Sequence, residues 1–295
     1  MAIALALLAA LSFAAGTVLQ QRGTLQAPAG ADDARFLVQI LHEPIWLAGA
    51  LCQMCGWILQ AAALDRGPLV VVQALTTLSL VIALPLGARL TTQHITRADV
   101  VAACAVLAGI VVFLSAGAPS GGTSTPTAAE WWTAGLLAVV LVGGAGAYGR
   151  RRHGATRAAL FGGAAGVGYA LQAAVTKVFV DELGHGVGAL LSSWTVYVLI
   201  VSAVVGFALQ QSALKTGVLA PAMASSNAST LVFSTIFGIV VFDERLTRGS
   251  GAFALALAGL ALAVVGVIRL AARAQPPASP PGTTSDPRAR AANPG

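Results

Sequence analysis

Two sets of polar side chains lie near the middle of long apolar segments. They are Gln73, Thr76 and Thr77, and Ser226, Asn227 and Thr230. The first set recurs at i, i+3 and i+4, and the second does so when it is counted from Met223, so each set occupies one face of a helix. Amides and hydroxyls carry no fixed charge, and this composition favours binding of a neutral or zwitterionic small molecule. The alternative is that they only hydrogen-bond neighbouring helices.

Two glutamines extend this candidate site. Gln20 and Gln172 occupy repeat-related positions towards the ends of two Gly/Ala-rich apolar segments, and we expect them to line the two vestibules of the site. The alternative is a position at the membrane interface. We expect function to depend most on Asn227, because its amide both donates and accepts hydrogen bonds.

Ionisable groups are absent from the centres of the apolar segments. The carboxylates fall at segment ends or in loops, and Lys177 lies near enough to an end for its ammonium to reach the interface by snorkelling. No carboxylate cage for Mg²⁺ is indicated, and no nucleophile, base and orienting group can be assembled. The sequence therefore predicts neither an enzyme nor a metal site nor a cofactor.

Two short motifs carry little functional information. Gly144, Gly146 and Gly149 spell G-x-G-x-x-G inside an apolar segment with no preceding strand, which favours helix packing over dinucleotide binding. Cys52 and Cys55 lack a second ligand pair, which favours a structural role over zinc binding.

Composition requires a membrane environment for most of the chain. Hydrophobic residues make up 57% of the sequence and charged residues only 9%, against about 25% charged in soluble domains. Segments long enough to cross a bilayer fall near 2–20, 44–63, 68–88, 98–116, 131–148, 158–178, 189–211, 217–241 and 250–271. These predict an all-α polytopic membrane protein with about nine helices. Short extra segments at 35–41 and 180–188 leave ten open.

The sequence repeats itself with an offset of 150 residues. Leu64 and Gly67 recur as Leu214 and Gly217, and the peptide LQAAAL at 59–64 recurs as LQQSAL at 209–214. The offset pairs helices 1–4 with helices 6–9. Five is an odd number of helices, so the second copy crosses in the opposite sense, as in transporters with inverted repeats. The domain prediction is a membrane unit over 1–274, with repeats at about 2–116 and 157–271 and a linking helix at 131–148, and a disordered cytoplasmic tail over 275–295.

The basic residues are unevenly distributed between the two sides of the membrane. Thirteen of the 17 lysines and arginines fall on the side of the C-terminal tail. The positive-inside rule then predicts an extracellular N-terminus and a cytoplasmic C-terminus in the cell membrane. This rule also accounts for the net charge of +6 without nucleic acid.

Two stretches resemble a known superfamily. The peptide GPLVVVQ at 67–73 and the peptide FDERL at 242–246, which precedes a small-residue helix, resemble the drug/metabolite transporter superfamily, in particular EamA-like transporters. The segment beginning at Trp46 is also similar to the NIPA-type magnesium transporter branch. That branch has an acidic residue in its second helix, whereas this chain has Cys52 or Gln53.

The resemblance implies a secondary transporter that works by alternating access. Its expected partners are a small-molecule substrate and membrane lipid, without nucleic acid, and a homodimer is left open. The alternatives are NIPA-like transport of magnesium or another divalent cation and a membrane scaffold or sensor that transports nothing.

Overall fold

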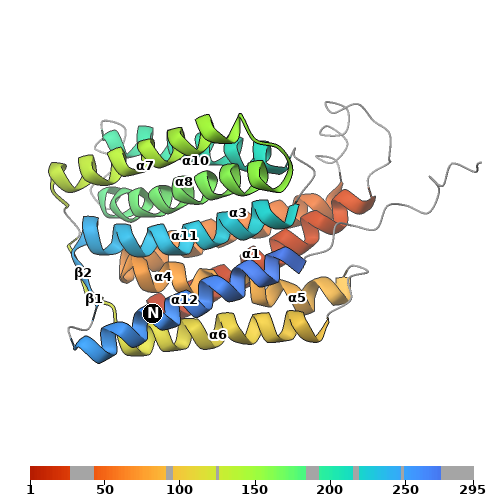
Figure 1. Cartoon of the computed structure of the whole chain (residues 1–295), viewed down its shortest axis with the longest axis horizontal. Coiled ribbons are helices and arrows are strands. Elements are labelled where there is room, and N and C mark those ends of the chain that lie inside the picture. Colours follow the sequence, from red (N-terminus) through yellow and green to blue (C-terminus); the bar gives the residue numbers. More distant parts are fainter. Residues whose placement is uncertain are drawn as a thin grey trace, which may run out of the picture.

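The computed structural model describes residues 1–26, 43–90, 96–123, 126–183, 193–214, 219–246 and 249–273. Figure 1 shows long helices lying side by side along one axis. In chain order they are α1 (Ala2–Gln26), α3 (Pro44–Arg66), α4 (Leu69–Thr76), α5 (Ser79–Leu90), α6 (Arg97–Gly117), α7 (Ala128–Gly149), α8 (Gly154–Leu183), α10 (Trp194–Leu214), α11 (Leu219–Phe242) and α12 (Ser250–Arg273).

The outer surface of the bundle is apolar. Ile58, Val139 and Phe207 keep 68%, 69% and 60% of their surface exposed. A continuous surface of this kind is unfavourable in water and natural against lipid. Within the described ranges eight spans are long and apolar enough to cross a membrane, and α10 adds a shorter apolar stretch, Trp194–Gln210. The chain is an all-α polytopic membrane protein.

Glycines set the closest helix contacts. A Cβ atom at Gly109 of α6 would overlap the backbone of Ala263 in α12, and one at Gly166 of α8 would overlap the carbonyl oxygen of Ser226 in α11. Helices in lipid associate mainly through such close van der Waals contact. α6 with α12, α1 with α3, and α8 with α10 and α11 are the main pairs. By contrast, a Cβ atom at Gly144 or Gly146 would meet no described atom within 4 Å, whereas one at Gly149 would contact Phe161 and Leu160 of α8. Of these three glycines, only Gly149 therefore lies at a helix contact within the described chain.

The third predicted span is interrupted. We expected one helix over 68–88, whereas the structure has α4 and α5 separated at Thr77 and Leu78. The Leu78 N–H donates to Leu75 O and the Leu80 N–H to Thr77 O, both one residue short of the α-helical pattern. The hydroxyls of Thr76 and Thr77 bond the Gln73 carbonyl oxygen, and bonding of this kind bends helices. Pro85 lies within α5 and does not mark the break.

The remaining spans lie close to their predicted places. One difference is a two-stranded antiparallel ladder that pairs β1 (Ser120–Gly121) with β2 (Glu244–Arg245). It joins the linker before α7 to the turn after α11, at one end of the bundle (Figure 1). The predicted tail (275–295), the segment 35–41 and most of 180–188 lie outside the described residues.

Candidate functional site

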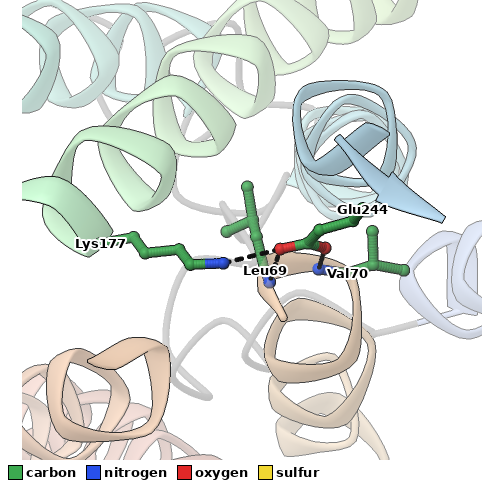
Figure 2. Close-up of polar contacts among 4 residues, drawn as sticks. All are labelled: Leu69, Val70, Lys177 and Glu244. Atoms are coloured by element: carbon green, nitrogen blue, oxygen red, sulfur yellow. Dashed lines mark hydrogen bonds and ion pairs between the residues drawn. The ribbon is translucent and has the colours of Figure 1, made fainter. Parts of the chain in front are cut away.

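A carboxylate is buried at the end of the bundle that holds β1 and β2. Glu244 is 2% exposed. Its Oε1 accepts a hydrogen bond from the Leu69 N–H at 2.5 Å, and its Oε2 accepts one from the Val70 N–H at 2.9 Å. These are the first free N–H groups of α4, because Pro68 before them has none. Figure 2 shows the carboxylate seated on this helix end, where the helix dipole favours negative charge.

Local sequence places the carboxylate there. α11 ends at Phe242, and Asp243 then adopts φ 49°, a conformation that aspartate tolerates better than most residues. The turn brings Glu244 opposite Gly121 in the ladder. A Cβ atom at Gly238 would lie 2.8 Å from Glu244 Oε2, so this glycine leaves room for the carboxylate.

Lys177 of α8 completes the group. Its Nζ lies 2.8 Å from Glu244 Oε1, and its side chain is only 14% exposed. The same ammonium lies 4.5 Å from the centre of the Phe242 ring. The prediction that Lys177 snorkels to the interface is wrong, because a buried carboxylate and an aromatic face are available nearby. We name this arrangement of Glu244, Lys177 and the α4 N-terminus the Glu244 latch.

Other contacts reinforce the same end of the bundle. Trp131 at the start of α7 packs edge-on against Trp194 of α10, at 5.0 Å between ring centres, and against Phe242. The carboxylate of Glu182 accepts hydrogen bonds from Ser193 and Thr195. Side-chain contacts therefore join α4, α7, α8, α10 and α11 at this end.

The first predicted polar set lies at the break between α4 and α5. Gln73 and Thr76 are buried, and Thr77 is half-buried. Both threonine hydroxyls donate to the Gln73 carbonyl oxygen, at 3.1 Å and 2.9 Å. Gln73 Nε2 is buried and has no hydrogen-bond partner among the described residues. This set therefore brings an unsatisfied donor into the bundle core.

The second predicted set lies along α11 and bonds its own helix and α8. Thr230 Oγ1 donates to Ser226 O and to Gly166 O of α8, and Asn227 Nδ2 donates to Met223 O. Among the described residues no hydrogen bond joins this set to Gln73, Thr76 or Thr77. Where α4 meets α11 the contact is apolar, with Val70 and Ala74 in one cluster with Ala228 and Leu231. That both sets line one cavity therefore stays a prediction.

The two predicted glutamines have different surroundings. Gln172 of α8 is 4% exposed, and within the described part of the chain its Oε1 has no hydrogen-bond partner. Gln20 of α1 packs on α3, where its Cγ would lie 2.8 Å from a Cβ atom placed at Gly49. Gln172 therefore has free hydrogen-bonding capacity in the core, whereas Gln20 lies at a helix contact.

Sequence reasoning missed the Glu244 latch. The signal was available, since the span order places Lys177 and Glu244 at the same end of their helices. The signal is weak, because charged residues at the ends of membrane spans ordinarily lie at the membrane interface. Within the described ranges no group of three or more His, Cys, Asp or Glu side chains is placed to hold a metal ion.

The chain is similar to a bacterial protein. It is 29% identical over 247 residues to an uncharacterized protein of Corynebacterium glutamicum, and the match covers 83% of this chain and 86% of the relative. No family model matches the chain, and no solved structure does. The similarity thus extends over most of both chains and carries no named activity.

Proposed function

We propose that this membrane protein is a secondary transporter of the drug/metabolite type that moves a neutral or zwitterionic small molecule by alternating access. Besides Gln210 Oε1, two buried amide atoms find no hydrogen-bond partner among the described residues, and they carry the proposal: the Gln73 Nε2 donor and the Gln172 Oε1 acceptor. They belong to α4 and α8, which contact each other. An unpaired amide in a membrane core is costly, and a ligand with its own donors and acceptors would relieve that cost.

Helix packing supports the inverted repeat. α1 packs on α3 and on α4 and α5, just as α8 packs on α10 and α11. α6 and α12, which the 150-residue offset relates to each other, pack together. A nine-helix bundle in which α1–α6 correspond to α8–α12 and α7 links the two halves accounts for these pairings. Transporters with such repeats bind substrate near mid-membrane, often beside interrupted helices, and α4 and α5 form one.

The Glu244 latch lies at one end of the bundle. Counting back 150 residues from Glu244 gives His94, and counting back the 152 residues that separate Gln20 from Gln172 takes Lys177 to Leu25. The aligned positions of the first repeat therefore carry neither the acid nor the base. With the N-terminus outside, the latch lies at the extracellular end and favours a resting state closed to the outside.

Cation transport is the second candidate. Its support is the similarity of the segment beginning at Trp46 to the NIPA-type branch. Against it, the position of that branch's acidic residue is held by Cys52 or Gln53. Gln53 donates to Thr17 Oγ1 at 3.4 Å, so it serves the α1–α3 contact.

A metabolite comparison tests the transporter proposal. Cells that lack or overproduce the protein should differ in the cellular and medium levels of at least one neutral or zwitterionic metabolite. Gln73→Leu and Gln172→Leu should abolish the difference while the protein still inserts, because each removes one unpaired amide. Gln53→Leu is the matched control and should keep transport. A difference confined to Mg²⁺ would favour the cation carrier, and no difference in any solute would favour a scaffold or sensor.

Orientation is tested separately with reporter fusions. A reporter active only in the cytoplasm should work when fused after Arg273 or after Arg152, and a reporter active only outside should work when fused after Gly121. The reason is the positive-inside rule applied to 13 of 17 basic residues. A tail fusion that works only outside would contradict the orientation, and together with an extracellular N-terminus it would also contradict the odd number of helices.

A further inference from the structure

A groove runs along the outer face of α6 and α12 at the end opposite the Glu244 latch. Its volume is ≈ 530 Å³, within the range of small-molecule sites. Its walls include Val101 on α6 and Leu262 and Val265 on α12, which remain 63%, 41% and 45% exposed. The groove therefore opens toward the surroundings of the bundle rather than into its core.

Two arginines stand at one end of this groove. α6 and α12 are antiparallel, as the close approach of Gly266 to Ala102 and of Gly109 to Ala263 shows. Arg97, the first residue of α6, and Arg269, in the last turns of α12, consequently line the same end. Both are exposed. In the described part of the chain neither has an acidic partner, since the nearby Asp99 carboxylate accepts from Thr96.

The positive charge of Arg97 at the N-terminus of α6 destabilises this helix when nothing is bound. A cation at a helix N-terminus meets the positive end of the dipole, and the first turn of α6 is already capped by Thr96 and Asp99. A bound anion would relieve the repulsion and pair with Arg269 as well. The rest of the groove is lined by apolar side chains, which suit a hydrocarbon chain.

We infer that this groove binds an anionic phospholipid, with the headgroup phosphate between Arg97 and Arg269 and an acyl chain along Val101, Leu262 and Val265. Basic pockets between membrane helices select anionic headgroups in this way. The inference does not depend on the transported substrate. It assigns α6 and α12 a lipid-binding role that is separate from the core amides.

Cys104 provides the probe for the test. It is exposed and lies one turn along α6 from Val101, about 10 Å from Arg97 at 1.5 Å per residue. The full chain with Cys52→Ser and Cys55→Ser is labelled at Cys104 with a fluorophore. It is then reconstituted in phosphatidylcholine vesicles that contain a trace of lipid with a nitroxide on the acyl chain. The nitroxide is carried by phosphatidylglycerol in one sample and by phosphatidylcholine in the other.

The expected result is a preference for phosphatidylglycerol on the order of tenfold, judged from quenching. Arg97→Gln with Arg269→Gln should bring the preference close to one. Arg150→Gln with Arg151→Gln is the matched control, because α7 returns to the side where α6 begins and the same charge is lost there; it should keep the preference. Three results would overturn the inference: equal quenching by both lipids in the parent, loss of the preference in the control, or its removal by inorganic phosphate, which would indicate a soluble anion.

Discussion

Glu244→Gln is expected to lower the free energy of unfolding by about 3 kcal/mol, in the range for breaking a buried ion pair. The carboxylate accepts from Leu69, Val70 and Lys177. A glutamine has one oxygen in place of two, and its NH₂ group would face a backbone N–H, so a donor would be left unpaired. Thermal denaturation of the purified protein in detergent should show a clear fall in Tm.

A double-mutant cycle tests whether Lys177 acts through Glu244. Lys177→Met alone should destabilise the protein, because the buried carboxylate loses its cation. In the Glu244→Gln background, Lys177→Met should lower the stability only slightly further, since no carboxylate charge remains to be paired. Fully additive losses would show that the two residues contribute independently and would contradict the latch.

The exposed ion pair between Asp243 and Arg245, which flank Glu244 in the chain, is the matched control. Arg245 and Asp243 also lie 3.0 Å apart, but their side chains are 60% and 65% exposed. Asp243→Asn should change stability by at most about 1 kcal/mol, because exposed ion pairs contribute little. Asparagine also tolerates the positive φ at this position.

The latch variant has a second readout if the protein alternates between conformations. Val70 is fully buried beneath the carboxylate. In a background without the native cysteines, Val70→Cys should react slowly with a membrane-impermeant maleimide added outside. Under the proposed orientation, Glu244→Gln should speed the reaction, because the end of the bundle that holds the latch opens more often. An unchanged rate alongside a lowered Tm would mean that the latch stabilises the fold without gating it.

The spans were predictable because lipid imposes a simple requirement on sequence. A helix that crosses a bilayer needs about 20 apolar residues, and the predicted 98–116 and 250–271 lie within α6 and α12. The break between α4 and α5 was not predictable from hydropathy. It depends on the adjacent hydroxyls of Thr76 and Thr77 bonding one carbonyl oxygen, whereas most threonines in helices leave the helix intact.

The candidate site was predictable only in part, because the contacts between its helices depend on the tertiary structure. Periodicity identifies which residues share a helix face, and it singled out Gln73, whereas the repeat singled out Gln172; both side chains are buried, and their role in binding stays a prediction. Periodicity does not specify which neighbouring helix a face meets. Thr230, for example, bonds Gly166 of α8. The latch joins residues 67 positions apart, and only the tertiary structure brings Lys177 to Glu244.

Gly166→Val is expected to be the other strongly disruptive change. The Cβ atom at this position would overlap Ser226 O and lie 2.8 Å from Ser229 Cβ and 3.0 Å from Thr230 N. Backbone atoms cannot move aside as a flexible side chain can, so α8 and α11 must separate. Overpacking of this kind costs about 1–3 kcal/mol, and separation would also break the bond from Thr230 to Gly166 O. The destabilisation is measured as the fraction of folded protein that remains after detergent extraction and as the Tm, both of which should fall.

Gly144 of α7 is the matched control for Gly166. A Cβ atom at Gly144 meets nothing within 4 Å, so Gly144→Val adds side-chain volume in open space and should leave Tm nearly unchanged. Gly166→Ala should fall between the parent and Gly166→Val, because its single methyl group already meets the Ser226 carbonyl. Equal losses at Gly144 and Gly166 would show that the α8–α11 contact does not explain the effect, since valine has a higher helix propensity than glycine and the exchange alone should not destabilise either helix. A tolerated Gly166→Val would mean that these two helices do not approach as closely as described, and the position of Thr230 against α8 would then be wrong as well.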